Sequence, residues 1–308
     1  MTRKNKAHIK SIRKHSRQLV RELDVLRIEY SDTGCTFSQC HVLFELSQKP
    51  AGLKELANVL LMDKSNTSRL VKKLVQDKLV AESQNSQDSR QKTFSVTRKG
   101  KQVLHEIVTI AERQVTGAMS HLSNEEQQQA IHGLKLYAGA LRTHRLQDGF
   151  EIRRIRKKDN AAVANVIREV MKEFNAVGQG YSIVDPEIDD MFGNYRDDNK
   201  RFYVVDSESD VLGCAGIAPL AGGNSKTCEL RKMFFKPEIR KRGLGKSLLR
   251  KLISDATEIG YEVCYLESLK RMDRAIKLYR MFGFKELKQP MGNTGHCSSD
   301  LWMKLDLR

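Results

Sequence analysis

The stretch ELRKMFFKPEIRKRGLGKSLLRKL, residues 229–252, gives the clearest indication of the fold of the C-terminal half. Its first part predicts a β-strand that contains Leu230 and the apolar run at 233–235. The strand is expected to end before Pro237, because proline has no backbone N–H to donate to a neighbouring strand. From Gly243 onward leucines recur at helical spacing, so a basic, glycine-containing loop leads from a strand directly into a helix. The first amides of a helix lack intrahelical acceptors and lie at the positive end of its dipole. This arrangement predicts an anion-binding site.

These residues distinguish among three known phosphate-binding loops. A P-loop would end in the Gly-Lys-Ser found at 245–247, but it requires glycine at position 240, which is Arg240. A dinucleotide-binding fingerprint would require glycine at position 248, which is Leu248. The pattern that fits without exception is Arg-x-x-Gly-x-Gly, formed by Arg240, Gly243 and Gly245.

This pattern resembles the signature of the GNAT family of acyl-CoA-dependent N-acetyltransferases, in which the loop holds the pyrophosphate of coenzyme A. A second family landmark, Ala-x-x-Leu-Tyr-x-x-x-Gly-Phe, is complete at residues 275–284, beyond a strand expected at 263–267. The resemblance implies acetyl-CoA as co-substrate. It also implies a set of coenzyme-binding residues along the strand end and the loop: Met233, Phe234, Phe235, Arg240, Lys241, Arg242, Gly243, Leu244, Gly245, Lys246 and Ser247.

The chemistry of acetyl transfer suggests which residues are catalytic. An amine that is mostly protonated at neutral pH must lose a proton before it attacks a thioester, so a base is needed. Glu229 matches the position of a carboxylate in many GNAT enzymes, although an ion pair with Arg231 or Lys232 is the competing interpretation. Glu267, on the adjacent strand, is the alternative base. Tyr279 matches the family's general acid toward the departing thiolate, and a buried, hydrogen-bonded tyrosine is the competing interpretation. The resemblance implies direct transfer without a covalent enzyme intermediate.

The rest of the C-terminal half fits the same fold. Strands are expected at 150–155, 201–206 and 211–219, with a closing strand at 298–305. An amphipathic helix is expected at 159–174. The polar segment 178–198 corresponds to the region that shapes the acceptor pocket in GNAT folds.

Composition limits the remaining possibilities. The chain has 308 residues, enough for about two domains, and a net charge of +16. Residues 1–148 hold 25 Lys and Arg against 15 Asp and Glu, so most of the excess lies there and favours a polyanionic partner. No run approaches the roughly 18 apolar residues of a membrane span, and six scattered cysteines suit the reducing cytoplasm. His105 would begin a zinc-binding motif, but the position of its second histidine is occupied by Thr109, so no metal is expected.

The N-terminal half predicts a helix-turn-helix. A long helix is expected over residues 4–27, and a capping box at Thr36–Gln39 begins another. Two short helices follow closely, at 53–60 and 66–78, separated by a break at 62–65.

The second short helix has the composition of a DNA-recognition helix. Positive and hydrogen-bonding side chains are concentrated on its outward positions, with Asp63 as the only acid nearby. A solvated surface helix, the competing interpretation, normally mixes both signs. The expected DNA-contacting residues are Lys64, Ser65, Asn66, Thr67, Arg69, Lys72 and Lys73. Two short strands, at 79–82 and 93–97, enclose a polar loop and predict a wing.

This order of motifs resembles the MarR family of winged-helix repressors over roughly residues 10–145. The resemblance rests on Glu55-Leu56-Ala57, Ser68-Arg69-Leu70, Asp88-x-Arg90 and Thr97-x-x-Gly100. It implies that Arg90, at the tip of the wing, enters a minor groove. The wing has Asp-Ser-Arg where Asp-Arg-Arg is commoner, so one basic contact is absent.

Two further helices, expected at 100–119 and 124–141, carry longer apolar stripes than a small winged domain can cover. Together with the first helix they are expected to form a homodimer. A two-fold dimer places two recognition helices about 34 Å apart on a palindromic operator in double-stranded DNA.

The sequence therefore predicts an α+β chain of two domains. Residues 1–146 form a mainly α winged helix-turn-helix domain for DNA binding and dimerisation. Residues 150–308 form an α/β GNAT domain with a mixed, mostly antiparallel sheet. The expected function is that of a cytoplasmic transcriptional regulator that also acetylates an amine. The alternatives are a regulator whose GNAT domain only senses acyl-CoA, and an enzyme whose MarR half is only a dimerisation scaffold.

Overall fold

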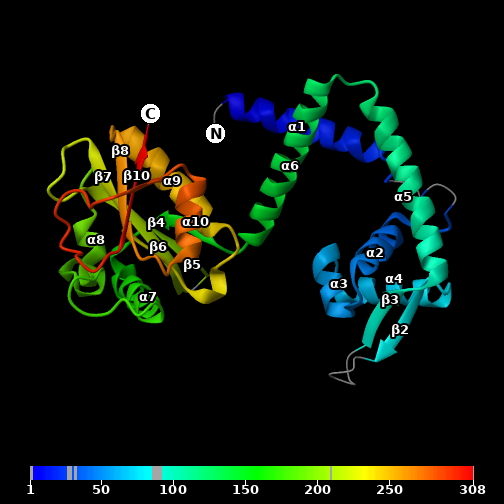
Figure 1. Ribbon diagram of the computed structural model, residues 1–308, viewed down its shortest axis with the longest axis horizontal. Coiled ribbons are helices and arrows are strands. Elements are labelled where there is room, and N and C mark those ends of the chain that lie inside the picture. Colours follow the sequence, from blue (N-terminus) through cyan, green and yellow to red (C-terminus); the bar gives the residue numbers. More distant parts are fainter. Residues whose placement is uncertain (1–2, 26–29, 31–32, 85–91, 209, 308) are drawn as a thin grey trace. The chain divides into compact units, whose positions relative to one another are not determined.

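The structure is a computed structural model that describes residues 3–25, 30, 33–84, 92–208 and 210–307 (Figure 1). The chain divides into two compact units, Met1–Ile131 and His132–Arg308, which are described separately. The division falls within one continuous helix, α6 (Asn124–Leu146). The second half of this helix therefore belongs to the second unit. The domain boundary expected from the sequence lies later, between residues 146 and 150.

The first unit combines helices with a small antiparallel sheet. Its helices are α1 (Arg3–Glu22), α2 (Phe37–Gln48), α3 (Leu53–Leu60), α4 (Lys64–Gln76), α5 (Arg98–Met119) and the beginning of α6. Strands β1 (Ala51–Gly52), β2 (Val80–Gln84) and β3 (Lys92–Val96) pair in the order β1-β3-β2. Strands β2 and β3 confirm the predicted pair of wing strands; the tip between them lies outside the described residues.

Local sequence signals explain where these helices begin and end. Thr36 and Gln39 form the predicted capping box at the start of α2. Helix α4 begins at Lys64, two residues earlier than expected, because the Asp63 carboxylate accepts a hydrogen bond from the Asn66 amide at 2.8 Å. Helix α1 ends at Glu22 rather than Arg27, and Asp24, just beyond it, has a φ of 56°.

The long helices leave apolar side chains uncovered. Ile9 and Ile12 of α1 and Val115 of α5 are exposed, and no residue of α6 is buried. The exposed apolar residues of α6 are Ile131, Leu134, Leu136, Tyr137 and Leu141. These stripes are larger than scattered surface residues of a monomer require.

The second unit is built on one seven-stranded sheet. Its strands are β4 (Glu151–Arg154), β5 (Arg201–Ser207), β6 (Asp210–Pro219), β7 (Thr227–Phe235), β8 (Val263–Ser268), β9 (Lys285–Leu287) and β10 (Leu301–Asp306). They pair in the order β4-β5-β6-β7-β8-β10-β9. Only the β7–β8 pair is parallel, which confirms the expected mixed, mostly antiparallel sheet. The short edge strand β9 was not predicted.

Helices cover both faces of this sheet. Helix α7 (Asn160–Glu173), with the short α8 (Met191–Asn194), packs on a core that includes Phe202, Val204 and Cys214. Helices α9 (Leu244–Ile259) and α10 (Asp273–Met281) pack on the opposite core, which includes Tyr203, Val205 and Ile217. Alternate residues of β5 thus face different layers, as strand geometry requires. Short 3-10 helices (Lys157–Asp159, Ser182–Val184, Pro186–Asp190 and Pro237–Ile239) complete the unit.

The two central strands separate in the middle of the sheet. Strands β7 and β8 pair only from Thr227 to Glu229, opposite Val263 to Tyr265, although both continue further. Pairing of β7 with β6 is irregular nearby, and Lys232 has a φ of 53°. The diverging strands leave space between their C-terminal halves.

Candidate active site

The loop before α9 has the geometry of an anion cradle. Gly243 caps the helix with a φ of 79°, a left-handed conformation that favours glycine. A Cβ atom added at Gly245 would lie 3.4 Å from Leu278 and 3.6 Å from Phe235, so the absence of a side chain leaves room at the cavity wall. The first-turn amides of this 16-residue helix have no intrahelical acceptors. Phosphate oxygens suit these amides.

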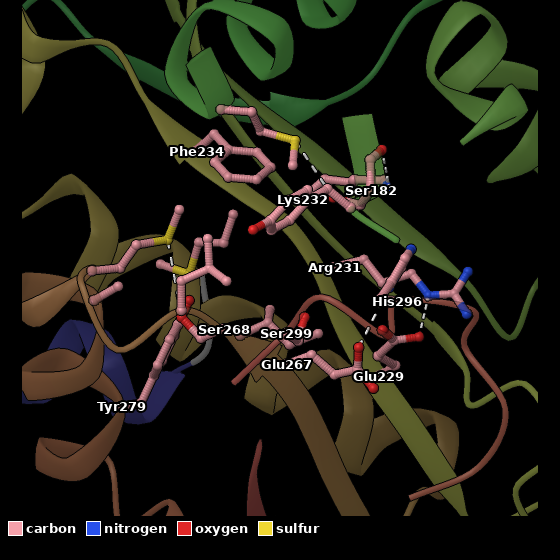
Figure 2. Close-up of a pocket in the computed structure, with 17 residues that line it drawn as sticks. Ser182, Glu229, Arg231, Lys232, Phe234, Glu267, Ser268, Tyr279, His296 and Ser299 are labelled. Carbon is pink, nitrogen blue, oxygen red and sulfur yellow. Dashed lines mark hydrogen bonds and ion pairs between the residues drawn. The ribbon is translucent and has the colours of Figure 1, made fainter. Parts of the chain in front are cut away.

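Two cavities meet where β7 and β8 diverge. The larger has a volume of about 520 Å³ and extends along the loop. Its wall includes eight of the expected coenzyme-binding residues: Met233, Phe234, Phe235, Arg240, Lys241, Gly243, Leu244 and Gly245. The smaller, of about 90 Å³, contains Glu229, Arg231, Lys232, Glu267 and His296 (Figure 2). Both cavities share five residues: Met233, Phe234, Met272, Ala275 and Tyr279.

The remaining three expected residues lie outside the larger cavity. Arg242 stacks over the ring of Phe150 at 5.1 Å, and Lys246 is exposed. Ser247 bonds to the side chain of Gln147.

Arg240 holds the loop in shape. Its Nε donates to the Phe235 carbonyl at 2.8 Å, and its two terminal nitrogens donate to the Glu173 carboxylate at 2.6 and 2.5 Å. The paired geometry fixes the guanidinium plane against α7. Arg240 thus has a structural role that the sequence pattern did not reveal.

Glu229 is a buried carboxylate with one strong partner. It is 3% exposed, and Arg231 donates from Nε to its Oε2 at 2.6 Å. Lys232, the other partner considered from the sequence, pairs instead with Asp185 and Glu187. Burial raises the pKa of Glu229, and the negative charge of Glu267 raises it further, although Arg231 opposes both. The ion pair therefore coexists with a carboxylate that is more basic than an exposed glutamate.

Glu267 lies beside Glu229 but in a different environment (Figure 2). Its Oε1 accepts hydrogen bonds from Tyr265 at 2.8 Å and Thr294 at 2.9 Å. Burial raises its pKa, but the neighbouring His296 ring and the hydrogen bonds from Tyr265 and Thr294 outweigh burial, so the pKa of Glu267 is lowered. Between the two alternatives, Glu229 is the stronger base.

Sequence reasoning missed His296. Its Nε2 lies 3.0 Å from Asp185 Oδ2, and its Nδ1 lies 3.5 Å from Glu267 Oε2. The hydrogen bond to Asp185 and the nearby Glu267 carboxylate raise the pKa of His296 to about 9, so the ring is cationic at neutral pH. Nothing in the local sequence marks this residue, because its partners lie about 110 and 30 positions away.

Within the described residues, no group of His, Cys, Asp and Glu is arranged to hold a metal ion.

Tyr279 lies where the two cavities meet. It is 6% exposed, and burial raises the pKa of its hydroxyl. No other group in the described part of the chain forms a hydrogen bond with this hydroxyl. A neutral phenol without a protein partner is free to donate to a ligand atom.

The first unit exposes most of the expected DNA-contacting residues. Lys64, Ser65, Asn66, Arg69, Lys72 and Lys73 of α4 are exposed. Arg69 donates to Asn66 Oδ1 at 2.6 Å, and Lys73 pairs with Asp77 at 2.9 Å. Lys64, Lys72 and Lys92 line a groove of about 1090 Å³ beside β3.

One expected contact is wrong, and another is not described. Thr67 is fully buried, because it shares a helix face with Val71 and Leu74, and its hydroxyl donates to the Asp63 carbonyl at 2.9 Å. Its side chain is therefore not available to DNA. Arg90 lies outside the described residues.

Comparisons with known proteins agree with this geometry. A model of the acetyltransferase (GNAT) family matches residues 166–284, and a model of the MarR family matches residues 33–91. The chain is 39% identical over 157 residues to the uncharacterized N-acetyltransferase YjgM of Escherichia coli K12, covering 51% of this chain and 94% of that protein. Two solved structures are also similar. One is a GNAT acetyltransferase of Staphylococcus aureus Mu50, with TM-score 0.47, 21% identity and coverage of 52% and 99%. The other is BpsR of Bordetella bronchiseptica, with TM-score 0.36, 20% identity and coverage of 42% and 98%.

The fold and the two joined cavities define an acyl-CoA-dependent acyltransferase. The chain belongs to the GNAT family of N-acetyltransferases, and the winged-helix region before its catalytic domain is similar to the MarR family over residues 33–91. Acetyl-CoA is the co-substrate of this family, and the glycine loop with its adjoining cavity fits a pyrophosphate and the chain attached to it. No helix within the described ranges is long and apolar enough to cross a membrane.

Proposed function

We propose that this protein both binds DNA and transfers the acetyl group of acetyl-CoA to an amine. One observation supports the enzymatic part above all others. The cavity along the phosphate loop joins the cavity of the buried carboxylates, and Tyr279 lines both. A thioester held along the first cavity would therefore reach an amine held in the second.

Glu229 is proposed as the base. It accepts a proton from the ammonium form of the acceptor, directly or through one water molecule, and leaves the nitrogen lone pair free to attack. Its raised pKa makes this transfer easier than it is for an exposed carboxylate. Arg231 fixes the orientation of the carboxylate.

Tyr279 is proposed as the acid. As the new N–C bond forms and the C–S bond breaks, the nitrogen releases its second proton to solvent and the leaving sulfur takes a proton from the Tyr279 hydroxyl. The products are an amide and the free thiol, and Glu229 then releases its own proton to solvent. The hydroxyl regains its proton from solvent. The bulk of the coenzyme is proposed to bind through the loop amides and the residues expected from the sequence.

The first unit is proposed to bind a palindromic operator as a homodimer. Support comes from the exposed positive residues of α4 and from the uncovered apolar stripes of α1, α5 and α6. A two-fold interface over these stripes would place two α4 helices on successive major grooves. Arg90 would approach the minor groove beside them.

The central experiment measures thiol release from acetyl-CoA with a panel of primary amines, using the full chain and the Glu229→Gln and Tyr279→Phe variants. We expect turnover with the unaltered chain and a loss of about 10²-fold or more in kcat for each variant. Binding of acetyl-CoA without turnover on any amine would instead favour an acyl-CoA sensor. A mobility-shift assay on the DNA upstream of the protein's own reading frame tests the regulatory half, and light scattering tests the homodimer.

A further inference from the structure

Charged side chains around the smaller cavity form a chain that alternates in sign. Glu267 lies 3.5 Å from His296, which lies 3.0 Å from Asp185. Asp185 pairs with Lys232, which also lies 3.4 Å from Glu187. Glu187 lies 3.7 Å from Arg231, whose Nε lies 2.6 Å from Glu229. These seven residues are named the charge chain.

The charge chain ends in a carboxylate on both sides. It contains four carboxylates and three cations, so its net charge is −1 when all are ionised. Its two ends, Glu229 and Glu267, line the smaller cavity from neighbouring parallel strands (Figure 2). The excess negative charge therefore lies where an acceptor would bind.

The cations of the charge chain are already occupied. The Lys232 side chain is 2% exposed and lies against Asp185, Glu187 and the Ser182 carbonyl. Both ring nitrogens of His296 face carboxylates. An anionic ligand would have to compete with these partners.

Unlike these cations, one carboxylate oxygen of the charge chain has no hydrogen-bond partner within the part of the protein that the structure describes. Glu267 Oε2 is buried and accepts no hydrogen bond from the described residues, and the Glu267 side chain is only 5% exposed. His296 Nδ1, at 3.5 Å, is close enough for charge attraction but does not form a hydrogen bond with this oxygen. A buried acceptor without a donor is unfavourable and uncommon in native structures. A ligand that supplies an N–H would satisfy it.

We infer that Glu267 is the residue that binds the acceptor's ammonium group, and that the site selects cationic amines carrying no carboxylate near the nitrogen. This inference rests on the proposed acetyltransferase function and extends it to a class of substrate. Glu267 Oε2 accepts one N–H of the ammonium group, while Glu229 takes the proton that must leave. A nearby carboxylate on the acceptor is repelled by the net negative charge and finds the cations already paired.

A three-carbon series tests this selection, because its members differ mainly in the charge of the far end. The acceptors are propylamine, 3-aminopropanoate and 1,3-diaminopropane, compared by kcat/KM with saturating acetyl-CoA. We expect 3-aminopropanoate to be at least about ten-fold poorer than propylamine, and 1,3-diaminopropane to be at least as good as propylamine. Equal or better use of 3-aminopropanoate would overturn the inference while leaving the proposed function intact. Failure of every amine would overturn both.

The variant Glu267→Gln tests the assigned residue. Loss of a charged hydrogen-bond acceptor is expected to raise KM for propylamine about ten-fold or more. We expect kcat and KM for acetyl-CoA to change less than about three-fold, and discrimination against 3-aminopropanoate to shrink. Glu286→Gln, on the exposed edge strand β9, is the matched control and should change none of these values. Unchanged KM and unchanged discrimination in a folded Glu267→Gln variant would refute the assignment, as would equal losses for amine and coenzyme.

Discussion

Gln147 donates a hydrogen bond from Nε2 to Oγ of Ser247 at 2.9 Å, which joins the residue after α6 to the first turn of α9. The same amide group lies 3.3 Å from the position of a Cβ atom on Gly243. The end of the connecting helix therefore packs directly on the phosphate loop. Since α6 begins in the first unit, the segment that joins the two halves also supports the coenzyme site.

The Gln147–Ser247 hydrogen bond should contribute a measurable coupling to the free energy of unfolding. In the double-mutant cycle of Gln147→Ala and Ser247→Ala, we expect a coupling of about 1 kcal/mol in the free energy of unfolding, because each single change removes the same hydrogen bond. Denaturant titration of the four proteins measures it. Fully additive effects would show that the contact contributes nothing to stability.

Gly243→Ala should weaken both stability and coenzyme binding. The residue has a φ of 79°, and a left-handed backbone costs an L-residue about 1–2 kcal/mol. The added methyl group also lies 3.3 Å from Gln147 and Thr143. We expect a rise of about ten-fold in Kd for acetyl-CoA, measured by calorimetry.

Gly260→Ala is the matched control for Gly243→Ala. Gly260 caps the other end of α9 with a φ of 98°, and no atom lies within 4 Å of its added Cβ. Stability should fall by a similar amount, whereas the Kd for acetyl-CoA should not change. Equal losses of affinity in both variants would mean that the effect comes from general destabilisation.

The pH dependence of turnover should show a base with a raised pKa. Because burial raises the pKa of Glu229, kcat should fall as pH falls through a value above that of an ordinary glutamate. In Glu229→Gln this acidic limb should disappear together with most of the activity. A profile from thiol-release rates between pH 5 and 9 measures it, and an unchanged limb in the variant would assign the titration to another group.

His296 should stabilise the fold in a pH-dependent way. Its pKa in the folded chain is raised to about 9, mainly by the hydrogen bond to Asp185 and the nearby Glu267 carboxylate, and Lys232 is the nearby opposing charge. A raised pKa means that the stabilisation is complete below the unfolded value, about 6.5, and is lost as pH rises toward 9. We expect His296→Gln to cost about 1–3 kcal/mol at pH 6 and much less at pH 9.5. Urea unfolding at both values measures the difference, and a loss independent of pH would contradict it.

Arg69→Ala should weaken DNA binding on all sequences. The residue is exposed on α4 beside Asn66, and loss of one phosphate contact should lower the slope of log Kd against log salt by about 1. Lys101→Ala, exposed on α5, is the control and should change little. Retention assays at four salt concentrations measure both, and identical curves for Arg69→Ala and the unaltered chain would remove α4 from the interface.

Sequence patterns predicted local features with good accuracy. The apolar run before Pro237 and the glycines at 243 and 245 predicted the strand, the loop and the helix that follows. Propensity and spacing alone gave the wrong direction for one side chain. Thr67 was assigned to the DNA face, but the helical repeat places it on the buried side with Val71.

The candidate site was only partly accessible from the sequence. Glu229 and Tyr279 belong to motifs with fixed spacing, so they could be named in advance. His296 and Asp185 could not, because each gains its importance from a partner more than 100 residues away. The choice between Glu229 and Glu267 also needed coordinates, since both are glutamates on adjacent strands.

The sequence by itself determined the order of elements, the family resemblances and the position of the glycine loop, because these depend on residues close together in the chain. Only the tertiary structure decided which carboxylate is more basic, which cations are already paired and which buried oxygen has no donor. Those properties depend on burial and on charges from distant segments. The pKa of a group and the lack of a donor for a buried acceptor depend on neighbours in space, and residue spacing along the chain does not encode them.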